Sequence, residues 1–474
     1  MRYILFIFFI FVNCIYSQYY SLADYINFLE KDHTFLKQQQ SIIDQSKHDY
    51  LAASSIEDWS MNHSIYTTHV SPYQTSSFSS SKYDSFGTSF GISRPVLNTG
   101  GLIDFSINNL RLKQDSIVYN GITFGEPLYY ENDITLSYTQ PLLFGFAGEV
   151  LKTNLIITST NVKNVSLESM DAYEDFLYQQ LNQYIQWFLQ HEITELNYRR
   201  LQLAKESLNQ TNERFKVNLS EKIDVLRAEY SVQKAYQQWL MQKSNLKSFQ
   251  LKLASLTGDT SIISKLPIYD LYETVYVKKP SYIIVDKLRV IQATVNQQIP
   301  LNQELKLNKS KRYGELNIVG SYSFIGGSTN FSDSMEYNKN NSSVYFNYSR
   351  SLSDSETKAI INSNNEKIKQ LDLYADQLKK TLKSEIIGLH TTIKEYELIL
   401  DGTLEQIIIA QKKATEEEAI YTQGRSSIDL VIQAQDNVLN SKLNYATLFA
   451  TYHQYVIQYQ ALTDELLTNY SITL

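Results

Sequence analysis

Acidic residues beside two turn-like sequences are the side chains whose type and spacing could do chemistry in this chain. Glu221 and Asp224 follow Asn218-Leu219-Ser220, and Asp429 follows Gly424-Arg425-Ser426. Carboxylates held together at a narrow place repel one another and attract cations. These three acids are therefore candidates for a site that attracts cations, and the alternative is that they are ordinary charges on solvated helix surfaces.

The chain lacks the sequence patterns that usually mark an enzyme or a metal site. Its seven His residues show no HxxxH or HxH spacing, the Ser-rich loops at residues 76–85 and 326–343 contain no Gly-x-Ser-x-Gly elbow, and there is no phosphate-binding loop. The run Glu416-Glu417-Glu418 is typical of a solvated helix face. We therefore predict that the protein is not an enzyme and has no catalytic residues, metal site or cofactor.

Two related helical segments follow these turn-like sequences. Val225, Ala228 and Val232 begin a heptad pattern that recurs 206 residues later from Val431. Alternating steps of three and four residues predict helices that pack as coiled coils. Asn218 and Gly424 occupy matching positions before the two patterns, and both residue types tolerate a left-handed backbone, so each copy is predicted to be helix, tight turn, helix. The two patterns comprise Val225, Ala228, Val232, Ala235, Trp239, Gln242, Leu246, Phe249, Leu253 and Leu256, and Val431, Ala434, Val438, Ser441, Tyr445, Leu448, Tyr452, Tyr455, Tyr459 and Leu462.

Long uninterrupted helices are predicted before each turn. Neither Gly nor Pro occurs between Gly148 and Gly258, and no Pro follows Pro300. Residues 150–217 could form one helix of roughly 100 Å at 1.5 Å per residue. Residues 356–422 carry a second heptad series, from Ile368 to Leu400. The chain is thus predicted to contain an internal repeat of helical hairpins, with first and second halves at 18–260 and 261–474.

The periodicity changes to two between the helical segments. Residues 86–93, 103–108 and 134–139 alternate apolar with small or polar side chains, and residues 316–324 and 344–349 do so more weakly. This alternation predicts β-strands with one apolar face. Such strands suit a transmembrane β-barrel, and a soluble antiparallel sheet would show the same pattern. The long helices and the 13% aromatic content, with 36 Tyr, favour the barrel.

The N-terminal residues have the features of a secretory signal peptide. Arg2 precedes a short apolar run, and Ser17 provides a small residue for cleavage, so we expect residues 1–17 to be removed. The only cysteine, Cys14, lies in this segment; lipidation of Cys14 is the alternative, but Phe11-Val12-Asn13 is a poor lipoprotein processing site. The net charge of −7 argues against binding to nucleic acid. No later stretch approaches 18 apolar residues, which excludes a helical membrane protein.

Several segments, in this order, resemble the TolC-type family of outer-membrane efflux channels. Leu136-Ser137-Tyr138-Thr139-Gln140-Pro141-Leu142-Leu143 followed by Gly145 is similar to the family's junction between strand and helix, and Ser93-Arg94-Pro95 is related to it. Tyr421-Thr422-Gln423-Gly424 with Ile428-Asp429-Leu430-Val431 is similar to the family's helix-tip sequence, and Ile223-Asp224-Val225-Leu226-Arg227-Ala228 is a degenerate copy. The resemblance covers nearly all of the mature chain.

The resemblance implies a mixed α and β membrane protein that forms a homotrimer. Each protomer would give two strands from each half to a shared barrel in the outer membrane, and long coiled-coil helices would form a periplasmic α-barrel. The expected partners are outer-membrane lipid, a periplasmic adaptor protein and an inner-membrane transporter. This chain departs from the family where Arg350-Ser351-Leu352 lacks the junction proline, and its first half has more alternating segments than two strands require.

The resemblance also implies roles for the two turns. Asp224, Glu221 and Asp429 would line a constriction at the periplasmic mouth, where the positions that match the family's acids are Asp224, Arg227, Leu430 and Gln433. Six residues would form the adaptor docking tips: Asn218, Leu219, Ser220, Gly424, Arg425 and Ser426. The alternative function is that of a secreted coiled-coil structural or adhesin-like surface protein. The family's exported substrates are diverse, so small molecules and proteins are both open as cargo.

Overall fold

The computed structural model describes residues 19–71, 73, 82–115, 117–119, 122–124, 128–269 and 274–470. The predicted signal peptide lies outside this part of the chain. Two compact units are present. We call Met1–Ile42, Leu167–Gln292 and Asp376–Leu474 the helical unit, and Ile43–Ser166 with Ala293–Ala375 the sheet unit. Among the described residues, no helix is both long and apolar enough to cross a membrane.

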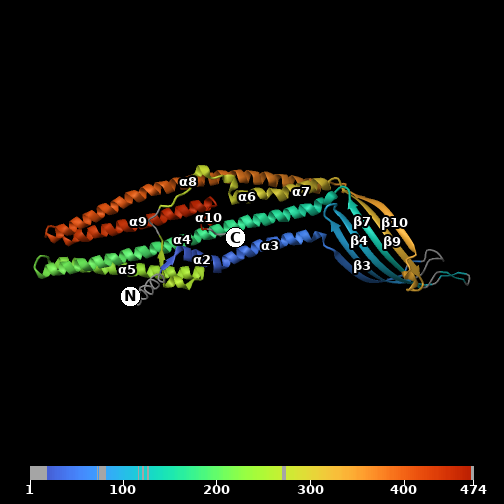
Figure 1. Cartoon of the computed structure of the whole chain (residues 1–474), viewed down its shortest axis with the longest axis horizontal. Coiled ribbons are helices and arrows are strands. Elements are labelled where there is room, and N and C mark those ends of the chain that lie inside the picture. The colour runs from blue at the N-terminus through green and yellow to red at the C-terminus, as the bar shows by residue number, and fades with distance from the viewer. Residues whose placement is uncertain are drawn as a thin grey trace, which may run out of the picture. The chain divides into compact units, whose positions relative to one another are not determined.

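The long helices form where the sequence predicts them. Helices α4 (Glu149–Lys216) and α8 (Ser355–Thr422) each have 68 residues, and each is followed after a short turn by α5 (Lys222–Thr257) or α9 (Ile428–Leu462). Figure 1 shows these two helix pairs, with both turns at the same end of the helical unit. The remaining helices are α2 (Leu22–Asp32), α3 (Thr34–Ser54), α6 (Arg289–Asn296), α7 (Gln298–Lys311) and α10 (Leu466–Asn469).

The predicted heptad positions face the interior of the helical unit. Ala228 and Ala235 of α5 are buried, as are Val431 and Ala434 of α9. Small side chains at these positions let neighbouring helices approach closely, which is how coiled-coil seams pack. Leu256 is an exception at the end of its series, because 51% of its surface is exposed.

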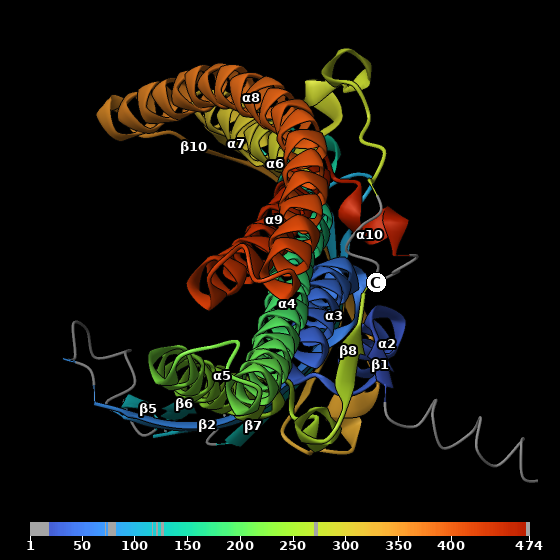
Figure 2. The same ribbon diagram turned by 90° about the vertical axis from the view of Figure 1, so that its left-hand side faces the viewer.

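Aromatic residues fill the core of the helical unit. Trp187 and Tyr184 of α4 have no significant exposed surface, and the same is true of Tyr25 in α2. The hydroxyl oxygen of Tyr184 lies 2.7 Å from the carbonyl oxygens of both Tyr20 and Ile268, between which it shares its one hydrogen. These carbonyls belong to β1 (Tyr19–Ser21) and β8 (Leu266–Ile268), a short parallel pair visible in Figure 2. Tyr184 therefore fixes segments from both halves of the chain onto α4.

A six-stranded antiparallel sheet dominates the sheet unit. Its strand order is β10-β9-β7-β4-β3-β2, and the strands appear on the right of Figure 1. The strands are β2 (Ser60–Val70), β3 (Tyr83–Val96), β4 (Gly101–Gln114), β7 (Leu128–Pro141), β9 (Glu315–Ser328) and β10 (Lys339–Ser349), and β5 (Ile117–Tyr119) with β6 (Ile122–Phe124) forms a separate hairpin. The first half contributes four strands to the sheet, so the two strands per half implied by the family resemblance do not hold for it.

The two faces of this sheet differ in chemistry across its central strands. Directly paired residues share a face of an antiparallel sheet. One row across the sheet runs through Met61, Ile92, Phe105, Leu136 and Tyr322, and the neighbouring row, on the other face, runs through Ser60, Ser93, Asp104, Ser137, Ser321 and Ser343. The predicted alternation is thus confirmed for β3, β4, β7 and β9. At the edges it is weaker, because the apolar row reaches Ser342 in β10, and His63 and Thr67 lie on the apolar side of β2.

Glycines permit close packing where strands of the sheet unit end. A Cβ atom on Gly100, which has φ of +73°, would lie 2.2 Å from the carbonyl oxygen of Gly145. A Cβ atom on Gly148, with φ of +72°, would collide with the carbonyl oxygen of Leu97. Both positions therefore require glycine. The two junction sequences recognised in the first half pack directly on one another through these backbones.

Candidate functional site

The two turns that join the long helices have the same backbone structure. Asn218 and Gly424 both have a left-handed backbone, with φ of +54° and +77°. The amide of Leu219 donates a 2.8 Å hydrogen bond to the carbonyl of Arg214, and the amide of Arg425 donates a 3.1 Å bond to the carbonyl of Ile420. These bonds span the same number of residues and form the Schellman type of helix end. The predicted tight turns at both positions are confirmed.

The surfaces of the two turns differ. The α4–α5 turn exposes apolar side chains, since Val217 is 62% and Leu219 is 67% exposed. In the α8–α9 turn, Gly424 and Arg425 are exposed, and Ser426 is half-buried. The hydroxyl of Ser426 donates a 2.9 Å hydrogen bond to the carboxylate of Glu417. One turn therefore exposes apolar side chains, and the other exposes a glycine and a charged arginine.

Arg214 connects the two turns. Its guanidinium donates hydrogen bonds to the carbonyl oxygens of Thr422, at 3.2 Å, and of Leu219, at 3.4 Å. The same group lies 4.4 Å from the centre of the Tyr421 ring, a cation–π distance. Tyr421 itself is buried, and its hydroxyl is 3.3 Å from the hydroxyl of Thr211. The ends of α4 and α8 are thus held together by side chains from both halves of the chain.

The three predicted constriction acids have different surroundings. The carboxylate of Asp224 accepts hydrogen bonds from the amide of Glu221, at 3.1 Å, and from the hydroxyl of Ser220, at 3.2 Å. These bonds make Asp224 part of the cap at the start of α5. Glu221 is exposed at that cap. Asp429, in the first turn of α9, is also exposed.

Arg227 brings two of these acids together. Its guanidinium lies 3.1 Å from the carboxylate of Asp429 and 3.6 Å from that of Asp224. Arg227 and Asp429 border a groove of about 370 Å³ between α5 and α9, which Lys234 and Asp436 also line. The groove therefore combines charges of both signs. The guanidinium of Arg227 therefore balances part of the negative charge of Asp224 and Asp429.

Neither arginine was identified as a functional residue from the sequence. Arg227 occupies a position where the resembled family has an acid, but nothing in the spacing of residues shows that it contacts Asp429 on another helix. Arg214 carried no sequence signal for its contact with the other turn, because its partner there, Thr422, lies 208 residues away. The run Glu416-Glu417-Glu418 is predicted to lie on a solvated helix face, and within it Glu417 also accepts a hydrogen bond from Ser426 of the turn.

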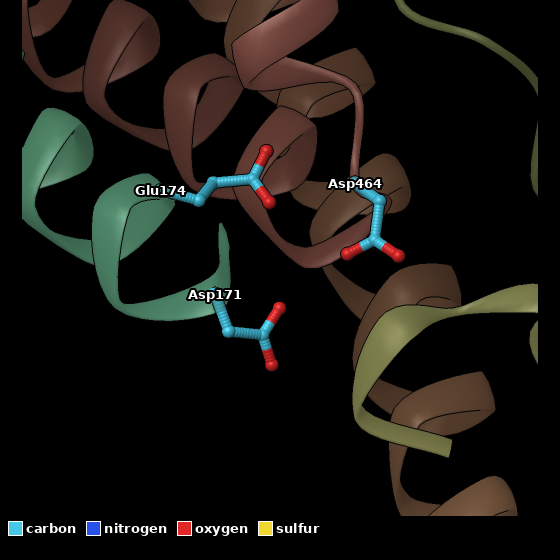
Figure 3. A group of neighbouring side chains, drawn as sticks. All are labelled: Asp171, Glu174 and Asp464. Atoms are coloured by element: carbon cyan, nitrogen blue, oxygen red, sulfur yellow. The ribbon is translucent and has the colours of Figure 1, made fainter. Parts of the chain in front are cut away.

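A second acidic group lies elsewhere in the helical unit. The carboxylates of Asp171, Glu174 and Asp464 offer oxygen atoms within 4.8 Å of one another. Figure 3 shows them converging from α4 and from the segment after α9. Glu174 is buried and accepts the amide hydrogen of Leu466 at 2.9 Å. Sequence reasoning based on histidine spacing could not detect this group.

Arg289 is the cation that this acidic group binds. Its guanidinium pairs with Glu174, and lies 3.2 Å from Asp171 and 3.3 Å from Asp464. The amide of Arg289 also donates a 2.6 Å hydrogen bond to Asp464. Burial raises the pKa of Asp171 and of Asp464 above the usual value, while Arg289 acts in the opposite direction on both. The guanidinium stands where a metal ion would have to bind, so this cluster serves as an ionic junction of α4, α6 and the end of α9.

Solved outer-membrane channels have the same fold. The outer membrane protein VceC of Vibrio cholerae is 12% identical, with 93% of this chain and 95% of that chain covered and a TM-score of 0.65. The Campylobacter jejuni outer membrane channel CmeC is 13% identical over 93% of this chain and 85% of that chain, with a TM-score of 0.64. The open Neisseria gonorrhoeae channel MtrE is 11% identical over 95% and 91%, with a TM-score of 0.65.

These matches establish the fold at low sequence identity. No protein-family model matches the chain. No curated protein matches it at the level of sequence. The chain has the fold of outer-membrane channels of the TolC type, as the order of its strand junctions and helix tips predicts.

Proposed function

We propose that three copies of this chain form an outer-membrane channel, which serves as the outer component of a tripartite export system. The observation that carries the proposal is the two-faced sheet. Residues such as Ile92, Phe105 and Leu136 give it one apolar face, and Ser93, Asp104 and Ser137 lie on the other. A sheet of this kind can meet lipid outside and water inside when it closes into a barrel.

Closure requires other copies of the chain. Both edges of the sheet are open within one protomer, at β2 and β10. Open sheet edges cannot remain in the hydrocarbon region of a membrane, because their backbone groups would lack hydrogen bonds. The trimeric state is the one implied by the family resemblance, and it would satisfy these edges by strand pairing between protomers.

The helical hairpins supply the periplasmic part of the proposed channel. The turns at residues 218–220 and 424–426 would meet a periplasmic adaptor, which connects the channel to an inner-membrane transporter. Asp224, Glu221 and Asp429 would stand at the periplasmic opening, with Arg227 controlling how much of their charge is unbalanced. The cargo, small molecules or proteins, would pass along the polar interior to the exterior.

The alternative function is a secreted, coiled-coil adhesin-like protein with a soluble sheet. Against it stands the exposed apolar face of the sheet, where Met61 is 70% and Val344 is 69% exposed. A water-soluble monomer seldom leaves so large an apolar surface uncovered.

Membrane fractionation and bilayer recording test the proposed function together. We expect the processed protein in the outer-membrane fraction, resistant to carbonate extraction, and as a trimer in mild detergent. The reconstituted trimer should give discrete conductance steps in planar bilayers. Release by carbonate as a monomer without channel activity would support the adhesin-like alternative.

A further inference from the structure

We propose that β2 of one protomer pairs with β10 of the next, so that all six strands of each chain enter the membrane barrel. The inference rests on the proposed trimeric channel and deepens it. It identifies another copy of this chain as the partner that pairs with each exposed edge of the sheet. It also sets the size of the barrel, since three copies of a six-stranded sheet give eighteen strands.

The edges themselves require a partner. Every residue of β10 is exposed, and in β2 every residue except Val70 is exposed. Large apolar side chains lie on both strands, among them Ile65 at 63% exposure and Phe346 at 66%. An open edge with such side chains is a template for pairing with another strand.

The directions of the two edges are compatible with mutual pairing. Each of the five adjacent pairs in the six-stranded sheet is antiparallel. Strand direction therefore alternates across the sheet, and β2 and β10, as its first and sixth strands, run in opposite directions. When β10 of a second copy is placed beside β2, the antiparallel alternation continues without a break.

The chemistry of the two faces also continues to both edges. On the polar face, the hydroxyl of Ser60 in β2 lies 2.7 Å from that of Ser93, and at the other edge the hydroxyl of Ser343 in β10 lies 2.7 Å from that of Ser321. On the apolar face, Met61 of β2 pairs with Ile92, and at the other edge Phe346 of β10 pairs with Ile318. Strands β2 and β10 have 11 residues each, which is enough to cross the hydrocarbon core when tilted.

This assembly determines the kind of passage that the barrel provides. Barrel diameter grows roughly in proportion to strand number, and barrels of about 16–18 strands enclose a water-filled channel. The side chains facing it would be small and largely uncharged along the serine row. The β2–β3 pair therefore widens the opening in the membrane compared with a barrel built from the four other strands of each chain.

Disulfide trapping between protomers tests the pairing directly. Cys14, the only native cysteine, lies in the predicted signal peptide. Disulfides in the processed protein would therefore form only between the introduced cysteines. Ser64→Cys on the polar face of β2 is combined in turn with Asn341→Cys, Ser343→Cys, Tyr345→Cys and Asn347→Cys on the polar face of β10. The matched control pairs Ser64→Cys with Phe346→Cys, which points to the opposite face.

Oxidation of outer-membrane fractions should convert one or two of the polar-face pairs to covalent dimers and trimers, and the control pair should stay monomeric in denaturing gels. A parallel set places Ser89→Cys of β3 against the same β10 positions. Cross-linking from the cysteine at position 89 and not from the one at position 64, or trimers without any β2–β10 cross-link, would overturn this inference. Neither result would contradict the proposed channel function. Absence of outer-membrane trimers in the cysteine-free protein would instead contradict the proposed function.

Discussion

The guanidinium of Arg214, at the end of α4, lies 4.4 Å from the centre of the Tyr421 ring, at the end of α8. These residues come from the two matching helix ends, and Arg214 also binds carbonyl groups of both turns. The contact means that one turn cannot move far from the other within a protomer unless this arginine releases its partners. Movement at the periplasmic end would then depend on Arg214.

Replacing Arg214 by Ala should loosen both turns without unfolding the long helices. A partly exposed cation–π contact is worth about 0.5–1 kcal/mol, and the lost hydrogen bonds add to this. We expect amide hydrogens at residues 218–220 and 423–425 to exchange about three- to tenfold faster in hydrogen–deuterium exchange. The matched control is Lys216→Ala, whose recorded partner is the exposed Glu213. Equal exchange in both variants would show that Arg214 does not hold the turns.

Arg227→Ala should increase the effect of cations on the channel. Removal of the guanidinium leaves the carboxylates of Asp224 and Asp429 without their shared partner, so block of single-channel current by divalent cations should strengthen. The shift in half-blocking concentration should be about fivefold or less, because exposed ion pairs are worth about 1 kcal/mol or less and are screened by salt. Replacing both acids by Ala should weaken block instead. Unchanged block in both variants would place these acids on an ordinary solvated surface.

Gly424→Val should impair docking while leaving the trimer folded. A residue with Cβ at φ of +77° costs about 1–2 kcal/mol, and a β-branched side chain is the least suited to this backbone. We expect loss of transport and of cross-linking to the adaptor. Gly424→Asn is the matched control, because Asn adopts the same backbone at Asn218 of the other turn. If the Val variant transports normally, Gly424 has no part in docking.

The acidic group around Arg289 should make stability depend on pH. Burial raises the pKa of Asp171 and Asp464 in the folded protein, so protonation favours the folded state. The contribution of these two carboxyl groups to the stability of the folded protein is therefore greatest at acidic pH. It is lost as the pH rises from about 4 through their raised pKa values. The melting temperature of the trimer should show this decrease, and it should become shallower in Asp171→Asn. Asp286→Asn, on an exposed ion pair with Lys379, is the control and should leave the slope unchanged.

Local sequence patterns predicted the elements but not the contacts between them. Asn218 and Gly424 revealed the turns because a left-handed backbone limits the residue type, and the absence of Gly and Pro allowed α4 to be placed almost to the residue. Strand β2 was not predicted, because His63 and Thr67 interrupt the apolar side of its alternation. The roles of Arg227 and Arg289 depend on residues far away in sequence, so no local pattern could indicate them.

Single-channel recording of the purified protein in planar bilayers tests the central claim most directly. The account predicts that the trimer isolated from outer membranes inserts to give discrete, ohmic conductance steps, and that Arg227→Ala changes their block by divalent cations. A protein that is a stable monomer in mild detergent, and that gives no conductance at any concentration, would contradict the account.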